Sequence, residues 1–211
     1  MAATKRKNMN PRIERKITRI SGVREVKQTF LIICEGVNTE PDYFNAFRLT
    51  SANVKAVGQG MGTLTLVQKA INIKEQEKRK GRIYNQNWVV FDKDDFPEND
   101  FNSAILLAQQ NGFKVAYSNQ AFEFWFLLHF NLYQGALHRS RYEKMLSTLL
   151  GFSYTKKSGV SSKMFNTLFS KQEQAINHAK TIMRQFDGNN PAQQESSTTV
   201  HLLVKELNKF L

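Results

Sequence analysis

The sequence predicts an α/β fold with a doubly wound, mostly parallel sheet of four strands and a basic helical C-terminal extension. Three observations favour this class. Short apolar runs that suit strands alternate with amphipathic stretches that suit helices between residues 28 and 137. The two most apolar of the predicted strands, with runs at residues 30–34 and 88–91, both lead into acidic residues, at the edge where parallel sheets bind their ligands. Apolar residues make up 41% of the chain, which is enough to build a core.

The first predicted strand covers residues 28–34, a continuous apolar run that suits a strand buried on both faces. Glu35 and Gly36 end this run. Thr39 then has the character of a helix N-cap, and Pro41 suits the first turn of the helix that follows. The order is therefore strand, turn and helix.

The same order recurs in the next part of the chain. A shorter strand is predicted over residues 54–57, followed by a glycine-rich turn at 58–62 and a helix with one apolar face. The turn lacks the Lys-Ser/Thr pair of a P-loop, so it indicates a flexible connection rather than a nucleotide site. A third strand over residues 87–91 leads into an acidic loop at 92–95.

The fourth strand closes the predicted sheet. A helix over residues 101–110, with Asp100 as its N-cap, precedes this strand, which covers residues 113–117. An aromatic segment over residues 121–130 follows it. Helices thus alternate with strands, which is typical of a parallel sheet.

The remainder of the chain has a different character. Amphipathic helices with basic faces are predicted there, interrupted by an exposed loop over residues 153–162. We therefore expect three parts: a basic N-terminal arm (1–27), a core (28–137) and a basic helical extension that packs on the core (138–211).

The charge of the chain is concentrated in two segments. The formal net charge is +12, and residues 1–27 and 138–185 each hold nine Lys or Arg against two Glu. A polyanion such as DNA or RNA is the natural partner of basic segments flanking a balanced core. The alternative is a coat of charge that serves solubility.

Composition also limits the location of the protein. The longest apolar runs are five residues, whereas a bilayer-spanning helix needs roughly 20, so we expect no contact with a membrane. Residues 1–24 lack the apolar stretch of a secretory signal. Cys34 is the single cysteine, which excludes an intrachain disulfide. We expect a cytoplasmic protein.

Three carboxylates are the first candidates for chemistry. Glu35 follows the first strand, and Asp92 and Asp94 follow the third. If these strands are neighbours, the three groups converge, and carboxylates this close repel one another unless a cation neutralises them. Hard oxygen ligands favour Mg²⁺ or Mn²⁺. The alternative is that these acids open loops and cap helices.

Four further residues are weaker candidates. Glu123 is a lone acid among aromatic residues and needs a partner, so it is either a site residue or part of an ion pair. Lys93 lies between the two aspartates, and a bend could bring it to a phosphate. His129 and His201 are more typical of hydrogen-bonded core histidines than of catalytic groups.

Three longer motifs follow one another along the chain: Cys-Glu-Gly-Val-Asn-Thr-Glu-Pro-Asp-Tyr-Phe (34–44), Val-Val-Phe-Asp-Lys-Asp-Asp-Phe (89–96) and Ser-Asn-Gln-Ala-Phe-Glu-Phe-Trp-Phe-Leu-Leu-His-Phe (118–130). Together they resemble the RloB family of Toprim-domain proteins. A tail motif, Ser-Ser-Thr-Thr-Val-His, spans residues 196–201, and the resemblance covers residues 28–211. The glycine that usually follows the Toprim aspartate pair is absent, because Asp95 stands there.

The resemblance implies a Toprim-like, metal-dependent nuclease that cuts DNA or RNA in prokaryotic anti-phage defence. Such AbiL-type abortive-infection proteins are encoded with an RloA-like ATPase of the SMC/AAA type, so we expect a complex with that ATPase or a homo-oligomer. In this resemblance Glu35, Asp92 and Asp94 are the catalytic residues and bind Mg²⁺ or Mn²⁺, and Glu40 and Glu123 are further metal ligands. The alternative is a non-catalytic nucleic-acid-binding or regulatory subunit of the same defence complex.

Overall fold

The computed structural model describes residues 28–211 apart from 48, 50–51, 59–61 and 158–159. The predicted arm (1–27) and the middle of the glycine-rich turn therefore lie outside the described residues. Within the described part, no helix is both long and apolar enough to span a bilayer.

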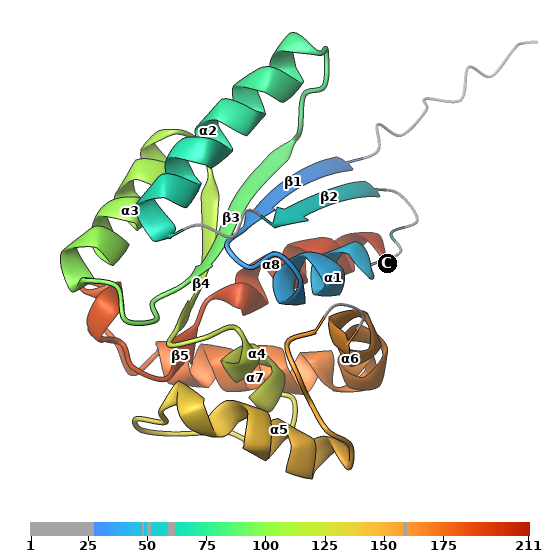
Figure 1. Ribbon diagram of the computed structural model, residues 1–211, viewed down its shortest axis with the longest axis vertical. Coiled ribbons are helices and arrows are strands. Elements are labelled where there is room, and N and C mark those ends of the chain that lie inside the picture. Colours follow the sequence, from blue (N-terminus) through green and yellow to red (C-terminus); the bar gives the residue numbers. More distant parts are fainter. Residues whose placement is uncertain (1–27, 48, 50–51, 59–61, 158–159) are drawn as a thin grey trace, which may run out of the picture.

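A single sheet with strand order β2-β1-β3-β4-β5 forms the centre of the molecule (Figure 1). The first four strands along the chain are parallel, and β5 is antiparallel to β4. The strands are β1 (Gln28–Cys34), β2 (Ala52–Gly58), β3 (Gln86–Asp92), β4 (Lys114–Asn119) and β5 (Ser197–Thr198). The four predicted parallel strands are confirmed. The fifth was not predicted, since two polar residues carry no periodicity.

Eight α-helices and four short 3₁₀ helices are found among the described residues. The α-helices are α1 (Thr39–Asn45), α2 (Thr63–Arg79), α3 (Glu98–Gln110), α4 (Glu123–Leu127), α5 (Tyr142–Leu150), α6 (Val160–Leu168), α7 (Gln172–Met183) and α8 (Val200–Leu207). The 3₁₀ helices are η1 (Arg139–Arg141), η2 (Phe169–Lys171), η3 (Pro191–Gln193) and η4 (Asn208–Phe210).

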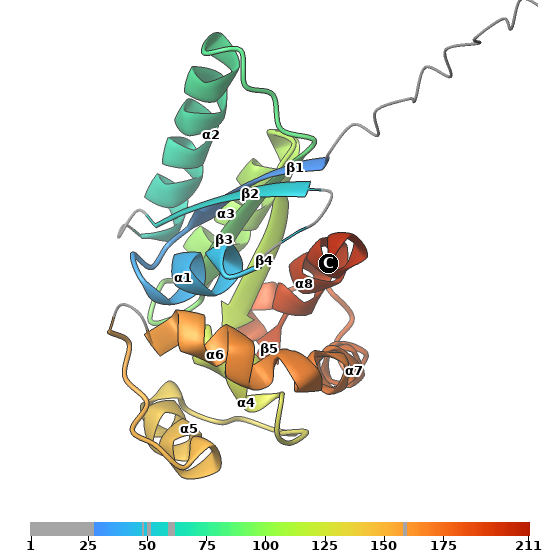
Figure 2. The same ribbon diagram turned by 90° about the vertical axis from the view of Figure 1, so that its right-hand side faces the viewer.

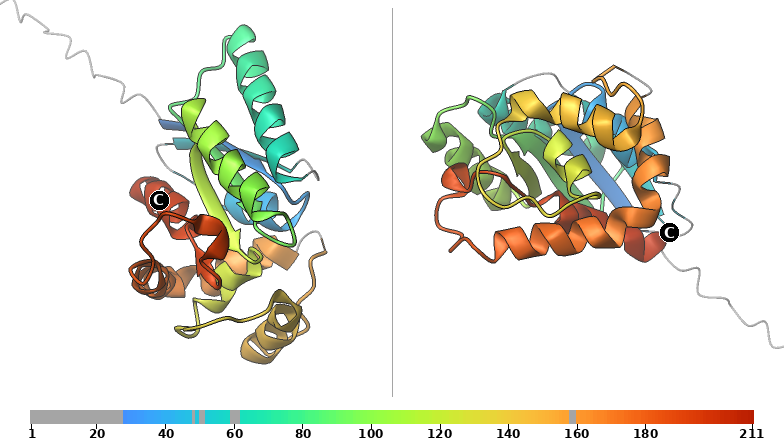
Figure 3. Two further views of the ribbon diagram at one scale, coloured as in Figure 1. Left: turned by 90° about the vertical axis from the view of Figure 1, so that its left-hand side faces the viewer. Right: turned by 90° about the horizontal axis from the view of Figure 1, so that it is seen from below.

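Helices cover both faces of the sheet (Figures 2 and 3). Alternate side chains of β1 point to opposite faces, as the pleat requires. Leu31 and Ile33 pack with α2 and α3, whereas Phe30, Ile32 and Cys34 pack with α1, α4 and the C-terminal helices. This two-sided burial explains why β1 is an uninterrupted apolar run.

The beginnings of two helices differ from the predictions. Asn38, not Thr39, is the N-cap of α1, because the Asp42 N–H donates to the Asn38 carbonyl oxygen (2.9 Å). Likewise α3 begins at Glu98, so Asp100 lies inside its first turn and is not the cap. In both helices the first backbone hydrogen bond lies closer to the N-terminus than the side-chain pattern indicated.

The structure also corrects the prediction of an exposed loop over residues 153–162. Tyr154 is buried, and its ring lies 6.1 Å from that of Phe126 between centroids. The helix α6 already begins at Val160. The prediction was wrong because one aromatic residue in a polar run carries little weight in a pattern, although its burial fixes the path of the segment.

The core beneath α1 is shared between the first and last parts of the chain. One cluster of buried side chains joins β1, α1 and α4 with α5, α6, α7 and α8. Tyr43 of α1 is at its centre, since its ring contacts those of Phe44, Phe47, Phe122, Phe126 and Phe165. Residues before and after position 137 therefore contribute to one continuous apolar core.

His129 gives the fold a pH-dependent element. The ring is fully buried, Nδ1 lies 2.9 Å from the Trp125 carbonyl oxygen, and Nε2 has no partner among the residues that the structure describes. Burial lowers the pKa of His129 from 6.5 to about 4, so the folded protein holds the ring neutral. Because the unfolded chain takes up the proton first, this contribution to stability is complete above pH 6.5 and is lost as the pH falls towards 4.

We therefore expect wild type and His129→Asn to differ in how their unfolding free energies change between pH 7 and pH 4. The asparagine amide can still donate to Trp125 but does not titrate. The wild type should lose roughly 3 kcal/mol more than the variant over this range. Urea unfolding at several pH values measures the difference, and parallel curves for the two proteins would contradict it.

Candidate functional site

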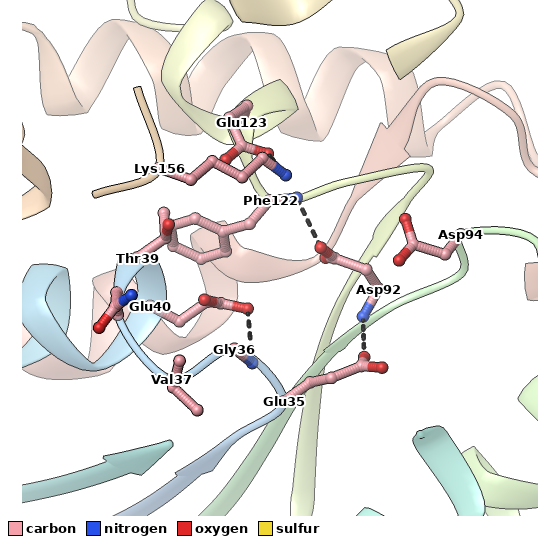
Figure 4. Close-up of a pocket in the computed structure, with 11 residues that line it drawn as sticks. Glu35, Gly36, Val37, Thr39, Glu40, Asp92, Asp94, Phe122, Glu123 and Lys156 are labelled. Atoms are coloured by element: carbon pink, nitrogen blue, oxygen red, sulfur yellow. Dashed lines mark hydrogen bonds and ion pairs between the residues drawn. The ribbon is translucent and has the colours of Figure 1, made fainter. Parts of the chain in front are cut away.

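The candidate site lies at the carboxyl ends of the two central strands (Figure 4). The chain leaves β1 towards β2 on one side, and β3 pairs on the other side, so the direction of the strand order changes between β1 and β3. Open α/β sheets bind their ligands at such a switch point. Glu35 directly follows β1 and Asp92 is the last residue of β3, which brings both to this crevice.

A cavity of about 250 Å³ at this position collects every carboxylate that the sequence nominated. Its acidic residues are Glu35, Glu40, Asp92, Asp94 and Glu123, and the remainder of the lining includes Phe122 and Lys156. The five acids come from four separate places in the chain: the end of β1, α1, the end of β3 with its loop, and the start of α4. Only the tertiary structure unites them.

Backbone amides hold three of these carboxylates in place (Figure 4). The Asp92 N–H donates to Glu35 Oε2 (3.0 Å), and the Phe122 N–H donates to Asp92 Oδ2 (3.0 Å). The Gly36 N–H donates to Glu40 Oε1 (3.2 Å). Each bond leaves the second oxygen of that carboxylate for another partner. Asp92 Oδ1 is buried and has no hydrogen-bond partner among the described residues.

Burial, together with neighbouring acids, raises the pKa values of three of these carboxylates, those of Asp92, Glu35 and Glu40. Burial, followed by the charges of Glu40, Glu123, Asp94 and Glu35, raises the pKa of Asp92 well above its ordinary value. The pKa of Glu35 rises to about 7, chiefly through burial and against the hydrogen bond from Asp92 N–H. The pKa of Glu40 also rises to about 7, chiefly through burial. The charged forms of these three carboxylates are therefore unfavourable in the metal-free cavity, and a bound cation would favour them.

Glu123 has both of the properties that the sequence left open. It lines the cavity, and it is also paired: Lys156 Nζ lies 3.0 Å from Oε2, and the Tyr154 hydroxyl donates to Oε1 (3.1 Å). Only 2% of the Glu123 side chain is exposed, whereas 55% of Lys156 is. The ion pair thus reaches from a buried acid to a base near the surface.

Asp94 lies at the mouth of the cavity and is held by an arginine that the sequence did not single out. The Arg139 guanidinium donates to Asp94 through one nitrogen and to Asp95 through another. Gln120 connects the Asp94 loop with Arg139. Its carbonyl oxygen accepts from Asp94 N–H (3.0 Å), and its Oε1 accepts from Arg139 N–H (2.7 Å). Asp94 itself has a positive φ of 41°.

Lys93 is not part of this lining. Its Nζ donates to the carbonyl oxygen of Phe96, within its own loop. His129 and His201 also lie apart from the cavity, each hydrogen-bonded to a backbone carbonyl of its own segment. The bases that do meet the acidic cavity are Lys156 and Arg139. Sequence reasoning missed them because two bases within a basic segment have no distinguishing pattern.

The donor set suits a hard divalent cation. All candidate ligands are carboxylate oxygens, and within the described ranges the buried Asp92 Oδ1 lacks the partner that a buried polar atom requires. Over the described residues, no three Asp, Glu, His or Cys side chains are already placed together around one point. In this arrangement Asp94 is turned to Arg139 and Glu123 to Lys156. The residues fit Mg²⁺ or Mn²⁺, provided that these side chains reorient.

Gly36 controls the position of Glu40. A Cβ atom at Gly36 would lie 2.8 Å from Glu40 Cδ, closer than any van der Waals contact. We expect Gly36→Ala to push the carboxylate out of the cavity and to reduce the rise in melting temperature that Mn²⁺ produces by at least half. Thermal melts with EDTA and with Mn²⁺ measure this. Gly135→Ala is a control for destabilisation away from the cavity: no described atom lies within 4 Å of its Cβ position, but its φ of 87° strains an alanine, so its melting temperature should fall while its Mn²⁺ effect persists. An undiminished Mn²⁺ effect in Gly36→Ala would contradict the assignment of Glu40.

The open parallel sheet and the carboxylates at its switch point define an α/β protein with an acidic site between its two central strands. Within this class, the chain belongs to the RloB-like family: the family model RloB, described as RloB-like protein, matches residues 30–207. The resemblance carried by the three motifs is confirmed at the level of the family. Comparison with curated proteins and with solved structures finds no match.

Proposed function

We propose that this protein is an Mg²⁺- or Mn²⁺-dependent nuclease with a Toprim-like core, which hydrolyses phosphodiester bonds in DNA or RNA. One observation carries the proposal. Five carboxylates line a single cavity at the switch point of the sheet, and one of them, Asp92, has a buried oxygen that finds no partner in the part of the chain that the structure describes. Such a set of acids is unfavourable without a cation and is suited to metal-assisted hydrolysis.

The roles of the residues follow from their anchoring. Glu35 and Asp92, each fixed by one backbone N–H, would hold the metal through their remaining oxygens together with Asp94. Glu40 and Glu123, on the α1 and α4 side, would supply further ligands. When bound, the ion would supply an activated water and stabilise negative charge on the phosphate. Glu35 would hold or release the proton at its carboxylate.

The biological setting that we propose is the one that the family resemblance implies. The nuclease would act in the cytoplasm in anti-phage defence, in a complex with an RloA-like ATPase. The described residues contain no element that would itself bind a nucleotide through a P-loop, so hydrolysis of ATP would belong to that partner. Co-purification of the two proteins from one expression host tests the complex.

Cleavage of defined substrates tests the central proposal. The purified protein is incubated with plasmid DNA and with tRNA, in EDTA and in Mn²⁺, with and without the ATPase. We expect cleavage of at least one substrate that depends on Mn²⁺. Metal-independent binding without cleavage, in the presence of the ATPase, would instead favour the non-catalytic subunit.

Binding of nucleic acid should depend steeply on salt. The arm (1–27) and residues 138–185 are the two basic segments, and every phosphate that they neutralise adds about 0.9 to the log–log slope on duplex DNA. Deleting residues 1–27 should therefore flatten the slope. Binding titrations between 50 and 200 mM salt measure it, and an unchanged slope would exclude the arm as a phosphate-binding element.

A further inference from the structure

A second cavity adjoins the carboxylate site. It has a volume of about 450 Å³ and shares Asp94, Glu123 and Lys156 with the first. Arg139, His138 and Ser140 are among the residues that line only the second cavity. Asp94, Glu123 and Lys156 thus lie between the two cavities, and Arg139 lies beside them in the second cavity.

Each base at this boundary is paired with a candidate metal ligand. Lys156 contacts Glu123, and Arg139 contacts Asp94 and Asp95. The acid Glu123 is buried while Lys156 is half-exposed, so the lysine reaches inward from the solvent. The Arg139 backbone is anchored by Gln120, which leaves the guanidinium as the part that can move.

A metal ion and these two bases compete for the same oxygens. A divalent cation bound to Asp94 or Glu123 would displace the guanidinium or the ammonium from that carboxylate. Partly exposed ion pairs contribute little to stability, so the exchange is not strongly opposed. Lys156 would then be an unpaired cation beside the second cavity, and Arg139 would keep only its pairing with the exposed Asp95. Guanidinium and ammonium groups are the usual ligands of phosphate oxygens.

We propose that Arg139 and Lys156 form a binding site for a nucleic-acid phosphodiester group, which becomes available when a divalent cation takes over Asp94 and Glu123. This inference rests on the proposed function, because it assumes a metal at the carboxylates. After the exchange the divalent cation neutralises the two carboxylates, and the phosphodiester group neutralises the two bases. Metal and nucleic acid therefore bind with positive coupling, and the coupling is reciprocal.

The test compares three variants that each remove one positive charge. Arg139→Gln and Lys156→Gln remove the proposed ligands. Arg141→Gln is the matched control, since Arg141 belongs to the same 3₁₀ helix as Arg139 but lines a different cavity with Tyr133 and Lys144. Calorimetry measures Mn²⁺ affinity. Fluorescence anisotropy measures the Kd of a cleavage-resistant phosphorothioate oligonucleotide in EDTA and in Mn²⁺.

In the wild type and in Arg141→Gln, Mn²⁺ should tighten oligonucleotide binding about 10-fold or more. In Arg139→Gln and Lys156→Gln this gain should fall to about 2-fold or less, while Mn²⁺ itself binds as tightly as in wild type or more tightly, because a competing base is gone. If these bases served only to order the carboxylates, the Mn²⁺ affinity would change in the opposite direction, and both variants would bind Mn²⁺ more weakly than wild type.

Three results would overturn the inference. The first is an undiminished gain in both variants although Mn²⁺ binds the wild type, which leaves the proposed function standing. The second is coupling with inorganic phosphate but none with the oligonucleotide, which would indicate a site for a small free anion. The third is the absence of any Mn²⁺ binding by the wild type, which would overturn the proposed function as well. Arg139 is near the surface, so Arg139→Gln remains informative if Lys156→Gln does not fold.

Discussion

Asp92→Asn should abolish metal-dependent cleavage while the protein stays folded. Asn keeps the shape of the side chain, and its amide oxygen can still accept from Phe122 N–H, as Asp92 Oδ2 does at 3.0 Å. It removes one charge and one strong metal ligand at the centre of the acidic cavity. Loss of a group of this kind typically lowers a rate by at least roughly 100-fold. A gel-based nuclease assay in Mn²⁺ measures the effect.

Thermal melts distinguish a catalytic from a structural Asp92. Burial and four neighbouring acids raise the pKa of Asp92, so its charged form is unfavourable in the metal-free protein and a neutral Asn does not carry that cost. In EDTA the variant should therefore melt no lower than wild type, and its gain on adding Mn²⁺ should be smaller. A structural Asp92 would behave differently, with the variant destabilised even in EDTA.

Asp100→Asn is the matched control for this experiment. Asp100 is exposed in the first turn of α3 and does not line the cavity, yet its replacement changes the net charge by the same amount. Cleavage and the Mn²⁺ effect should both persist in this variant. A fully active Asp92→Asn protein would contradict the proposed nuclease.

Tyr43→Ala should have the largest effect on stability. The ring is fully buried and contacts five other aromatic rings, and its hydroxyl accepts from Trp125 Nε1 (3.1 Å) and Gln172 Nε2 (3.3 Å). Truncation of a large buried aromatic residue leaves a cavity, so we expect a loss of about 4 kcal/mol in unfolding free energy. Tyr43→Phe keeps the ring but strands both donors, and should lose about 1–2 kcal/mol.

Urea unfolding followed by tryptophan fluorescence and by circular dichroism measures both variants. Phe152→Ala is the control, since Phe152 is 42% exposed, and its effect should stay within about 0.5 kcal/mol. Both probes should report one transition, because Tyr43 joins α1 to α4, α6 and α7 in a single core. A loss below about 1 kcal/mol for Tyr43→Ala would show that the core collapses around the missing ring.

Much of the sheet could be predicted from local patterns. The run over residues 28–34 has the length and the continuous apolar character of a strand buried on both faces, and β1 covers these residues. Helix ends were less accessible, since Asn38 and Pro97 act as caps through backbone geometry without a side-chain hydrogen bond. The strand β5 consists of two polar residues and depends on its pairing with Ser118 and Asn119.

The candidate site divides in the same way. Glu35, Asp92 and Asp94 could be named from the sequence, because they follow apolar strands and parallel strands end at one edge of a sheet. Glu123 stood out as a lone acid among aromatic residues, whereas Glu40 depended on a family motif, which falls within the matched residues 30–207. The sequence also pointed to Lys93, whose side chain instead bonds to Phe96 outside the cavity lining.

Apolar periodicity and contiguous motifs are local properties of a chain, so they were enough to predict the class of fold, the family and the acids that line the cavity. The bases that contact those acids became visible in the folded structure alone. Lys156 reaches Glu123 across 33 positions because Tyr154 anchors the intervening segment in the core, and Arg139 reaches Asp94 because Gln120 holds both backbones. Such pairings are set by packing between distant segments, and nothing in the spacing of the residues along the chain encodes them.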